Sequence, residues 1–290
     1  MFWPNGEISM GLSMPVNSHT APPQSPQVRE RQGQKQTSHS KKMVRNGAWW
    51  IEKHVPRSRL AFATMTLPNE AVEALEARED AAAIYADINR VFQQWLSRRL
   101  EAAGAFSYIV GCDEVQPGRW KKYRKVALHT HLLFQAAVQK GNWIISKEEF
   151  QAKWLEIVNA KLNIASESNS ATRIEKVKRS AEHYLAKYMS KSGNVVDEII
   201  EAGKRYLLPA HWWHCSNALK KKVKSMCVEV SEKAGEILYG QREELKNQGI
   251  LQWFYVHEIE LHQSHGEPLK IPVAFCAKFS KPEHREMFIY

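Results

Sequence analysis

The sequence lacks a long apolar run. Across its 290 residues, none approaches the roughly 20 consecutive apolar residues that a membrane-spanning helix needs. We therefore expect no membrane-embedded segment and no membrane partner. The first residues, Met-Phe-Trp-Pro-Asn-Gly, also lack a basic region followed by an apolar core, so the sequence indicates no signal peptide.

Cysteine is scarce as well. The four cysteines are scattered and form no CxxC pair: Cys112, Cys215, Cys227 and Cys276. This spacing argues against a structural zinc site and against a disulfide framework. It suits a reducing compartment, so we expect a cytoplasmic protein.

Acidic residues are in deficit. The chain has 41 Lys and Arg against 31 Asp and Glu, which gives a net charge of +10 and an isoelectric point near 9.3. Such an excess favours a polyanionic partner, and nucleic acid more than an anionic membrane. The hydrophobic content of 43% is ordinary for a globular protein, and the length suffices for one substantial core with an appendage or for two small domains.

The composition predicts three parts. Residues 1–47 are rich in Ser, Pro, Gln, Gly, Arg and Lys and have little apolar periodicity, which is typical of a disordered basic tail. Residues 48–225 contain the packable segments that we expect to form the main domain. Residues 226–290 form an extension that either closes the same sheet or makes a small second unit.

Apolar periodicity predicts strand, helix, strand, strand, helix, strand and helix in that order. The expected strands are 60–67, 106–115, 126–135 and 173–177, and the expected helices are 69–100 with a break near 79–80, 146–162, and one around 184–191. This order favours an α+β fold, an antiparallel sheet with helices packed on one face, of ferredoxin-like type. Between the second and third strands we expect a long hairpin tip with five basic residues: Arg119, Lys121, Lys122, Arg124 and Lys125.

Two histidines alternate on the third predicted strand, where the sequence reads Leu-His-Thr-His-Leu. Alternation places His129 and His131 on one face about 7 Å apart, where two imidazoles can bind one divalent ion. Such a pair is more often structural, and β-sheet zinc enzymes share the spacing. The neighbouring strand offers Asp113 and Glu114, only one of which can face the histidines; we prefer Glu114. A carboxylate ligand shifts the preference toward Mg²⁺ or Mn²⁺.

A short stretch further along combines phenols and ammonium groups. On a helix, at about 100° per residue, four side chains share one face: Tyr184, Lys187, Tyr188 and Lys191. Ser180 suits the start of this helix and Gly193 its end. Tyrosines and lysines together suit a nucleophile beside an anion site, although an ordinary amphipathic helix has the same pattern.

Three stretches resemble the motifs of HUH endonucleases, and they occur in the same order: Thr64-Met-Thr-Leu-Pro68, His129-Thr-His131-Leu-Leu-Phe134, and Tyr184 to Lys191. The form with two tyrosines is similar to the rolling-circle replication initiators (Rep proteins) of phages and plasmids, of the phage gene-A type. The resemblance covers about residues 58–225. The loop between Glu114 and His129 is longer than is usual in that family.

The resemblance implies a metal-dependent nickase with the ferredoxin-like HUH nuclease fold. Mg²⁺ or Mn²⁺ on His129, His131 and Glu114 would polarise a scissile phosphate, and Tyr184 or Tyr188 would attack it. The products are a 5′-phosphotyrosine and a free 3′-OH at a replication origin, and a second tyrosine permits strand joining. Lys187 and Lys191 would assist the phenol or hold phosphate. No Walker A sequence is present, so we expect a host helicase and polymerase as partners.

Single-stranded DNA is the expected substrate, and the basic hairpin tip is expected to hold its backbone together with four further residues. These are Arg173, Lys176, Lys178 and Arg179. We expect Thr64 and Thr66 to complete the sheet without touching substrate, and the remaining histidines, His183, His211 and His214 among them, to be structural or on the surface.

Other functions fit parts of the same pattern. A single-strand transposase or a plasmid relaxase would use the same chemistry, but relaxases usually carry the tyrosine before the histidines. A non-catalytic DNA-binding protein would be expected to lose a histidine or the tyrosines, and none is missing. A zinc hydrolase would use His129 and His131 and leave the tyrosine helix incidental.

Overall fold

The computed structural model describes residues 7–11, 38–168, 171–178, 180–181, 184–185, 188, 193–225, 227, 231–261 and 269–288. The chain divides into two compact units, Arg29–Lys222 and a unit that combines Met1–Val28 with Val223–Tyr290. Among the described helices, none has the length and apolar character needed to cross a membrane.

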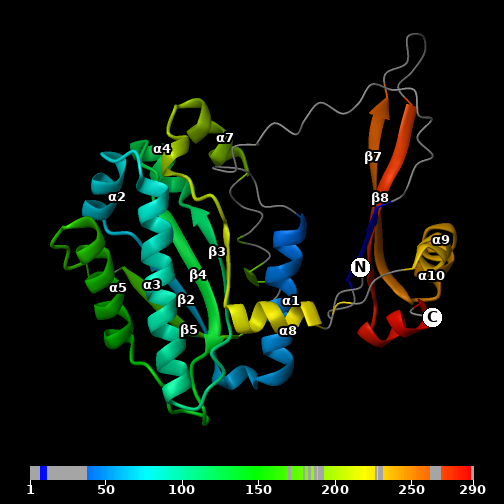
Figure 1. Ribbon diagram of the computed structural model, residues 1–290, viewed down its shortest axis with the longest axis horizontal. Coiled ribbons are helices and arrows are strands. Elements are labelled where there is room, and N and C mark those ends of the chain that lie inside the picture. Colours follow the sequence, from blue (N-terminus) through cyan, green and yellow to red (C-terminus); the bar gives the residue numbers. More distant parts are fainter. Residues whose placement is uncertain are drawn as a thin grey trace. The chain divides into compact units, whose positions relative to one another are not determined.

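The larger unit contains a five-stranded sheet and the helices around it (Figure 1). Its elements are α1 (Ser38–His54), η1 (Arg57–Arg59), β2 (Leu60–Thr66), α2 (Asn69–Glu76), α3 (Ala81–Ala102), β3 (Ile109–Val115), α4 (Pro117–Tyr123), β4 (Leu128–Gln135), α5 (Lys147–Leu162), β5 (Thr172–Lys176), α7 (Gly193–Glu201), η2 (Arg205–Leu207), β6 (Trp213–Cys215) and α8 (Asn217–Ser225).

The sheet has the strand order β5-β2-β4-β3-β6, and every neighbouring pair is antiparallel. Two helical connections skip a strand: the path from β2 to β3 leaves β4 between them, and the path from β4 to β5 leaves β2 between them. The expectation of an α+β fold with an antiparallel sheet is confirmed. The four expected strands are present, and β6 adds a fifth that periodicity did not reveal.

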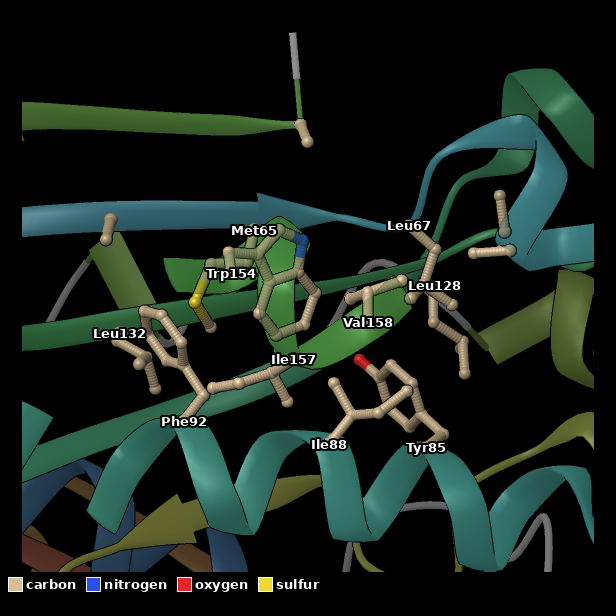
Figure 2. Close-up of a cluster of buried hydrophobic side chains, with 14 of the residues drawn as sticks. Met65, Leu67, Tyr85, Ile88, Phe92, Leu128, Leu132, Trp154, Ile157 and Val158 are labelled. Carbon is tan, nitrogen blue, oxygen red and sulfur yellow. The ribbon is translucent and has the colours of Figure 1, made fainter. Parts of the chain in front are cut away.

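Side-chain alternation explains why α3 and α5 cover one face of this sheet. Apolar residues that alternate along the strands meet the apolar stripes of both helices (Figure 2). The labelled residues of this layer are Met65, Leu128 and Leu132 from the strands, Leu67 directly after β2, Tyr85, Ile88 and Phe92 from α3, and Trp154, Ile157 and Val158 from α5. The Ser146 hydroxyl accepts a hydrogen bond from the Glu149 amide, so Ser146 caps α5 at the residue where the sequence predicts that this helix starts.

The expectation of a disordered tail over residues 1–47 is wrong for two segments. Helix α1 begins at Ser38, and β1 (Glu7–Gly11) is a strand. Buried residues on α1 recur at helical spacing, so the helix can bury one face: Met43, Val44, Ala48 and Ile51. Helix α1 packs against β3, β4 and β6 on the face opposite α3 and α5, so helices cover both faces and not one.

The hairpin tip between β3 and β4 is also more ordered than expected. It contains α4, with Pro117 in its first turn, where a missing backbone N–H costs nothing. Trp120 anchors this helix because its ring is buried and its indole N–H donates to Glu198 on α7, at 2.7 Å. Gly193, expected to end the tyrosine helix, is the first residue of α7; residues 189–192 lie outside the described part of the chain.

The smaller unit has its own three-stranded antiparallel sheet, in the order β1-β8-β7. Its other elements are α9 (Glu232–Gly240), α10 (Arg242–Asn247), β7 (Leu251–Leu261), β8 (Leu269–Phe279) and η3 (Pro282–Phe288). Ile8 of β1 shares a buried core with Leu238, Phe275 and Phe279. The extension over residues 226–290 is therefore a second unit, and it takes one strand from the N-terminal segment.

Candidate active site

The two histidines lie on the sheet face opposite α3 and α5, at the centre of the sheet. In the register of β2, β4 and β3, Thr66 and Glu114 are the partners of His129, and Thr64 is a partner of His131. Because partners across a ladder point to the same face, three adjacent strands present polar side chains together.

Hydrogen bonds join these side chains. His131 Nε2 lies 3.1 Å from Glu114 Oε2, and His131 Nδ1 lies 3.1 Å from the Thr64 hydroxyl. His129 Nε2 faces the Thr66 hydroxyl at 3.4 Å. The two threonines, which we expected only to complete the sheet, are therefore the side chains that orient the imidazoles. Their alternation in Thr64-Met-Thr66, opposite the alternation of the histidines, was the signal in the sequence.

Asp113, the alternative to Glu114, points to the opposite face. Its Oδ1 accepts hydrogen bonds from the Tyr85 hydroxyl at 3.0 Å and the Thr130 hydroxyl at 2.8 Å, and it lies 2.9 Å from His214 Nε2. Burial, and then the charge of Asp113, raise the pKa of Tyr85 well above its usual value, so this phenol stays a donor. His214, expected to be structural or on the surface, thus belongs to a polar network directly behind the histidine strand.

His129 is held in its neutral form. Burial, then repulsion from His131 and Arg119, lower its pKa from 6.5 to about 3. A neutral imidazole has a free ring nitrogen lone pair, which is the form that binds a metal ion.

This pKa shift predicts that His129 makes folding stability depend on pH. In the unfolded chain this side chain binds a proton below about pH 6.5, whereas in the folded chain it does so only near pH 3. The folded state is therefore destabilised relative to the unfolded state as the pH falls from 6.5 to 3. We expect His129 to account for about 3 kcal/mol of lost stability between pH 7 and pH 4.5. Urea unfolding of the wild type and of His129→Gln at both pH values measures it.

In that experiment, His129→Gln should lose about 3 kcal/mol less than the wild type between the two pH values. A matched variant at the exposed His211, His211→Gln, should behave as the wild type does. Equal losses in wild type and His129→Gln would contradict the assignment.

Both tyrosines of the predicted helix come to the histidine face. Tyr184 and Tyr188 have helical backbone, and the buried Ala181 and Leu185 anchor the same segment. The Tyr188 ring stacks on His131 with ring centroids 3.9 Å apart, while the Tyr184 ring lies against Phe62, 4.2 Å away. Lys187 and Lys191 lie outside the described residues.

The two phenols are coupled to each other. The Tyr188 hydroxyl donates a hydrogen bond to the Tyr184 oxygen at 3.0 Å. Burial raises the pKa of Tyr184 above its usual value of 10, and this hydrogen bond raises it further. Tyr184 therefore keeps its proton more firmly than a free tyrosine does.

The histidines, the threonines, Glu114 and both tyrosines line one cavity of about 780 Å³. Three of the predicted DNA-binding residues line it as well, namely Arg119, Lys122 and Arg173. The exposed Tyr123 lies beside them, and the Lys122 ammonium stands over its ring. The cavity thus combines imidazole, hydroxyl, carboxylate and phenol groups with two cations on α4 and one on β5.

The other predicted DNA-binding residues lie elsewhere. Arg124 stacks on Trp120 and faces Glu198 at 3.6 Å, and Lys125 forms an ion pair with Glu73. Lys121 is on α4 but does not line the cavity. Lys176 and Lys178 line a neighbouring groove, and Arg179 lies outside the described residues.

The chemical groups present are suited to binding a divalent ion, because the imidazoles of His129 and His131 and the carboxylate of Glu114 share one face of the sheet. In the arrangement described, His131 and Glu114 already meet, but His129 Nε2 faces Thr66. Accordingly, no group of three or more His, Cys, Asp or Glu side chains among the described residues has the geometry to hold a metal ion. His129 would have to turn from Thr66 to join the other two.

Comparisons of the chain with family models, with curated proteins and with solved structures find no match.

Proposed function

We propose that this protein is a metal-dependent endonuclease and strand transferase that nicks and joins single-stranded DNA at an origin of rolling-circle replication, as HUH initiators of phages and plasmids do. The observation that carries the proposal is the stacking of Tyr188 on His131. A helical segment distant in sequence brings a tyrosine to the sheet face on which His129, His131 and Glu114 gather.

The fold supports the same proposal. The four strands β5-β2-β4-β3, with both helical crossovers skipping one strand, have the order of the ferredoxin-like arrangement that the HUH resemblance implies. In this arrangement β2 and β4 are the central strands, so the residues they carry are held on both sides by ladder hydrogen bonds.

Glu114, His131 and a reoriented His129 are the residues that would hold Mg²⁺ or Mn²⁺. The ion, when bound, supplies charge that stabilises the phosphate oxygens as the tyrosine attacks. Thr64 and Thr66 orient the imidazoles from β2, and burial keeps His129 neutral and ready to bind.

Tyr188 is the better nucleophile of the pair. Its oxygen attacks phosphorus, a tyrosine–phosphate bond forms and the bond from phosphorus to the 3′ oxygen breaks; the phenol loses its proton and the departing 3′ oxygen gains one. Tyr184 keeps its proton and can turn its hydroxyl to donate to the Tyr188 oxygen as negative charge develops there. The free 3′-OH can prime a host polymerase.

Arg119 and Lys122 are the cations that would neutralise the DNA backbone at the cavity; Arg173 also lines it but is paired with Glu175. The net charge of +10 adds a longer-range attraction to any polyanion.

The test is covalent attachment to DNA. The full chain is incubated with a pool of labelled single-stranded oligonucleotides with and without Mn²⁺, and the products are separated under denaturing conditions. We expect an adduct that needs the metal ion and is at least about 10²-fold less abundant in His131→Ala. An adduct that forms equally well in His131→Ala, or no adduct with any strand including DNA of its own replicon, would refute the proposal.

A further inference from the structure

A second concave surface lies beside the candidate active site, between α5 and β5. It is a groove of about 1150 Å³, and its lining includes Trp143, Lys147, Gln151, Lys176 and Lys178. One wall is the α5 face that carries Lys147 and Gln151. The other wall is β5, the edge strand of the five-stranded sheet.

The groove adjoins the active-site cavity at β5. Thr172, Arg173 and Glu175 line both hollows. Alternation along β5 puts Arg173 and Glu175 on the histidine face, where they are the register partners of Thr64 and Phe62, and puts Ile174 and Lys176 on the α5 face, so the two hollows meet at this edge strand. A flexible chain whose reacting atom lies at Tyr188 therefore has only the β5 edge to pass before it reaches the groove.

The cations of the groove are available to a ligand. In the described part of the chain, Lys147, Lys176 and Lys178 are exposed and none of them forms an ion pair. Arg173 is different, because it pairs with Glu175 at 2.8 Å. Glu148 and Glu167 also line the groove, so three unpaired ammonium groups stand against two carboxylates outside the Arg173 pair.

The groove also has an aromatic side chain. Trp143 is half-buried, with part of its ring packed against the core and part lining the hollow. An indole face beside lysines is the combination that holds a base and its phosphates in proteins that bind single strands.

We propose that this groove binds the nucleotides that flank the scissile phosphate on one side, with Trp143 stacking on a base and Lys147, Lys176 and Lys178 holding phosphates. The inference rests on the proposed function and extends it from the cleavage point to a second DNA subsite. The α4 side of the active-site cavity, with Arg119, Lys122 and Tyr123, is left for the other flank.

An extended peptide that adds a strand to the β5 edge is the rival occupant. Two observations favour DNA. The strand β5 has only five residues, three of them charged, which is how natural sheets prevent strand addition. The groove also shares three lining residues with the cavity that contains the tyrosines, and a peptide bound along the β5 edge would have no use for that cavity.

The test compares two triple variants of the full chain that have the same net charge. Lys147→Glu, Lys176→Glu and Lys178→Glu reverse the groove lysines; Lys53→Glu, Lys140→Glu and Lys153→Glu make the same change at residues that do not line the groove. Fluorescence anisotropy measures binding of labelled (dT)20 and (dT)6 without metal ion. The groove variant should bind (dT)20 at least about tenfold more weakly than the control variant, and the slope of log K against log salt should fall by about 2, because each lost phosphate contact removes about 0.7.

A second experiment locates the base. Oligonucleotides that contain 4-thiothymidine are crosslinked by light, and the modified peptide is identified by mass spectrometry. We expect crosslinks at Trp143, and about tenfold weaker binding of (dT)20 by Trp143→Leu, which keeps an apolar side chain at the core. Circular dichroism checks that Trp143→Leu is folded; the charge reversals test the groove independently of it.

Equal affinity of the two triple variants for (dT)20, or crosslinks confined to the α4 side, would overturn the groove assignment. If hydrogen exchange of the peptides that line the groove does not change on DNA binding, the groove assignment is also overturned, and the rival occupant, a peptide at the β5 edge, is favoured.

These measurements do not depend on DNA cleavage, so they distinguish the groove assignment from the proposed function. If the wild type forms no covalent adduct but the groove variant still loses affinity, the proposed function fails and the DNA subsite stands. If the wild type forms the adduct and the two triple variants bind (dT)20 with equal affinity, the proposed function stands and the DNA subsite in the groove is refuted.

Discussion

Replacing Tyr188 with Phe is expected to abolish covalent attachment of the protein to single-stranded DNA, with the initial rate falling at least about 10³-fold. Replacing Tyr184 with Phe is expected to slow the same step only about tenfold. The reason is position: the Tyr188 ring stacks on His131, whereas Tyr184 lies against Phe62 and keeps its proton because burial raises its pKa. The measurement is the initial rate of adduct formation with Mn²⁺, followed by peptide mapping of the attachment site.

Tyr239→Phe in the smaller unit is a matched control and should attach to DNA as the wild type does. The joining reaction should be more sensitive to Tyr184→Phe than the first cleavage is, if Tyr184 acts second. The opposite result, an adduct mapped to Tyr184 that survives Tyr188→Phe at full rate, would reverse the assignment of the two tyrosines.

Gly111→Ala is expected to destabilise the larger unit by about 3 kcal/mol or more. Gly111 lies on β3, and a Cβ atom built there would be 2.0 Å from the backbone oxygen of His131 on β4. Backbone cannot yield as a flexible side chain does, so β3 and β4 must separate at this point. Because Glu114 and His131 meet across the same ladder, the separation should also weaken the site.

Urea unfolding measures the loss of stability. Gly118→Ala is the matched control: a Cβ atom at Gly118, on helix α4, meets nothing within 4 Å, so this variant should be neutral or more stable by up to about 1 kcal/mol. If the free energies of unfolding of Gly111→Ala and the wild type agree within about 0.5 kcal/mol, the close approach of the two strands is contradicted.

Local sequence patterns were enough to predict most strands and two of the helices of the larger unit. Period-two alternation predicts β2, β3, β4 and β5, and period-3.6 stripes predict α3 and α5, because these segments bury one face against the same core. The same reasoning failed for α1. Its buried stripe is short and follows a polar, basic stretch, so composition outweighed periodicity.

Long-range pairing was outside the reach of such patterns. Nothing in the first residues indicates that Glu7–Gly11 pairs with β8, since the two strands are more than two hundred positions apart. Register in a sheet depends on which side chains of the two strands fit a common core, so it cannot be predicted from the pattern of either strand alone.

For the candidate site, the sequence by itself determined that His129 and His131 share a face, because strand side chains alternate with a period of exactly two. It also limited the third polar group to Asp113 or Glu114. Tertiary structure alone decided between them: the ladder puts Glu114 opposite His129, whereas the core behind the sheet, with Tyr85 and Thr130, takes Asp113. It alone also brought Tyr188 onto His131, because the approach of a helix to a sheet is set by packing between distant segments and not by the order of residues within either.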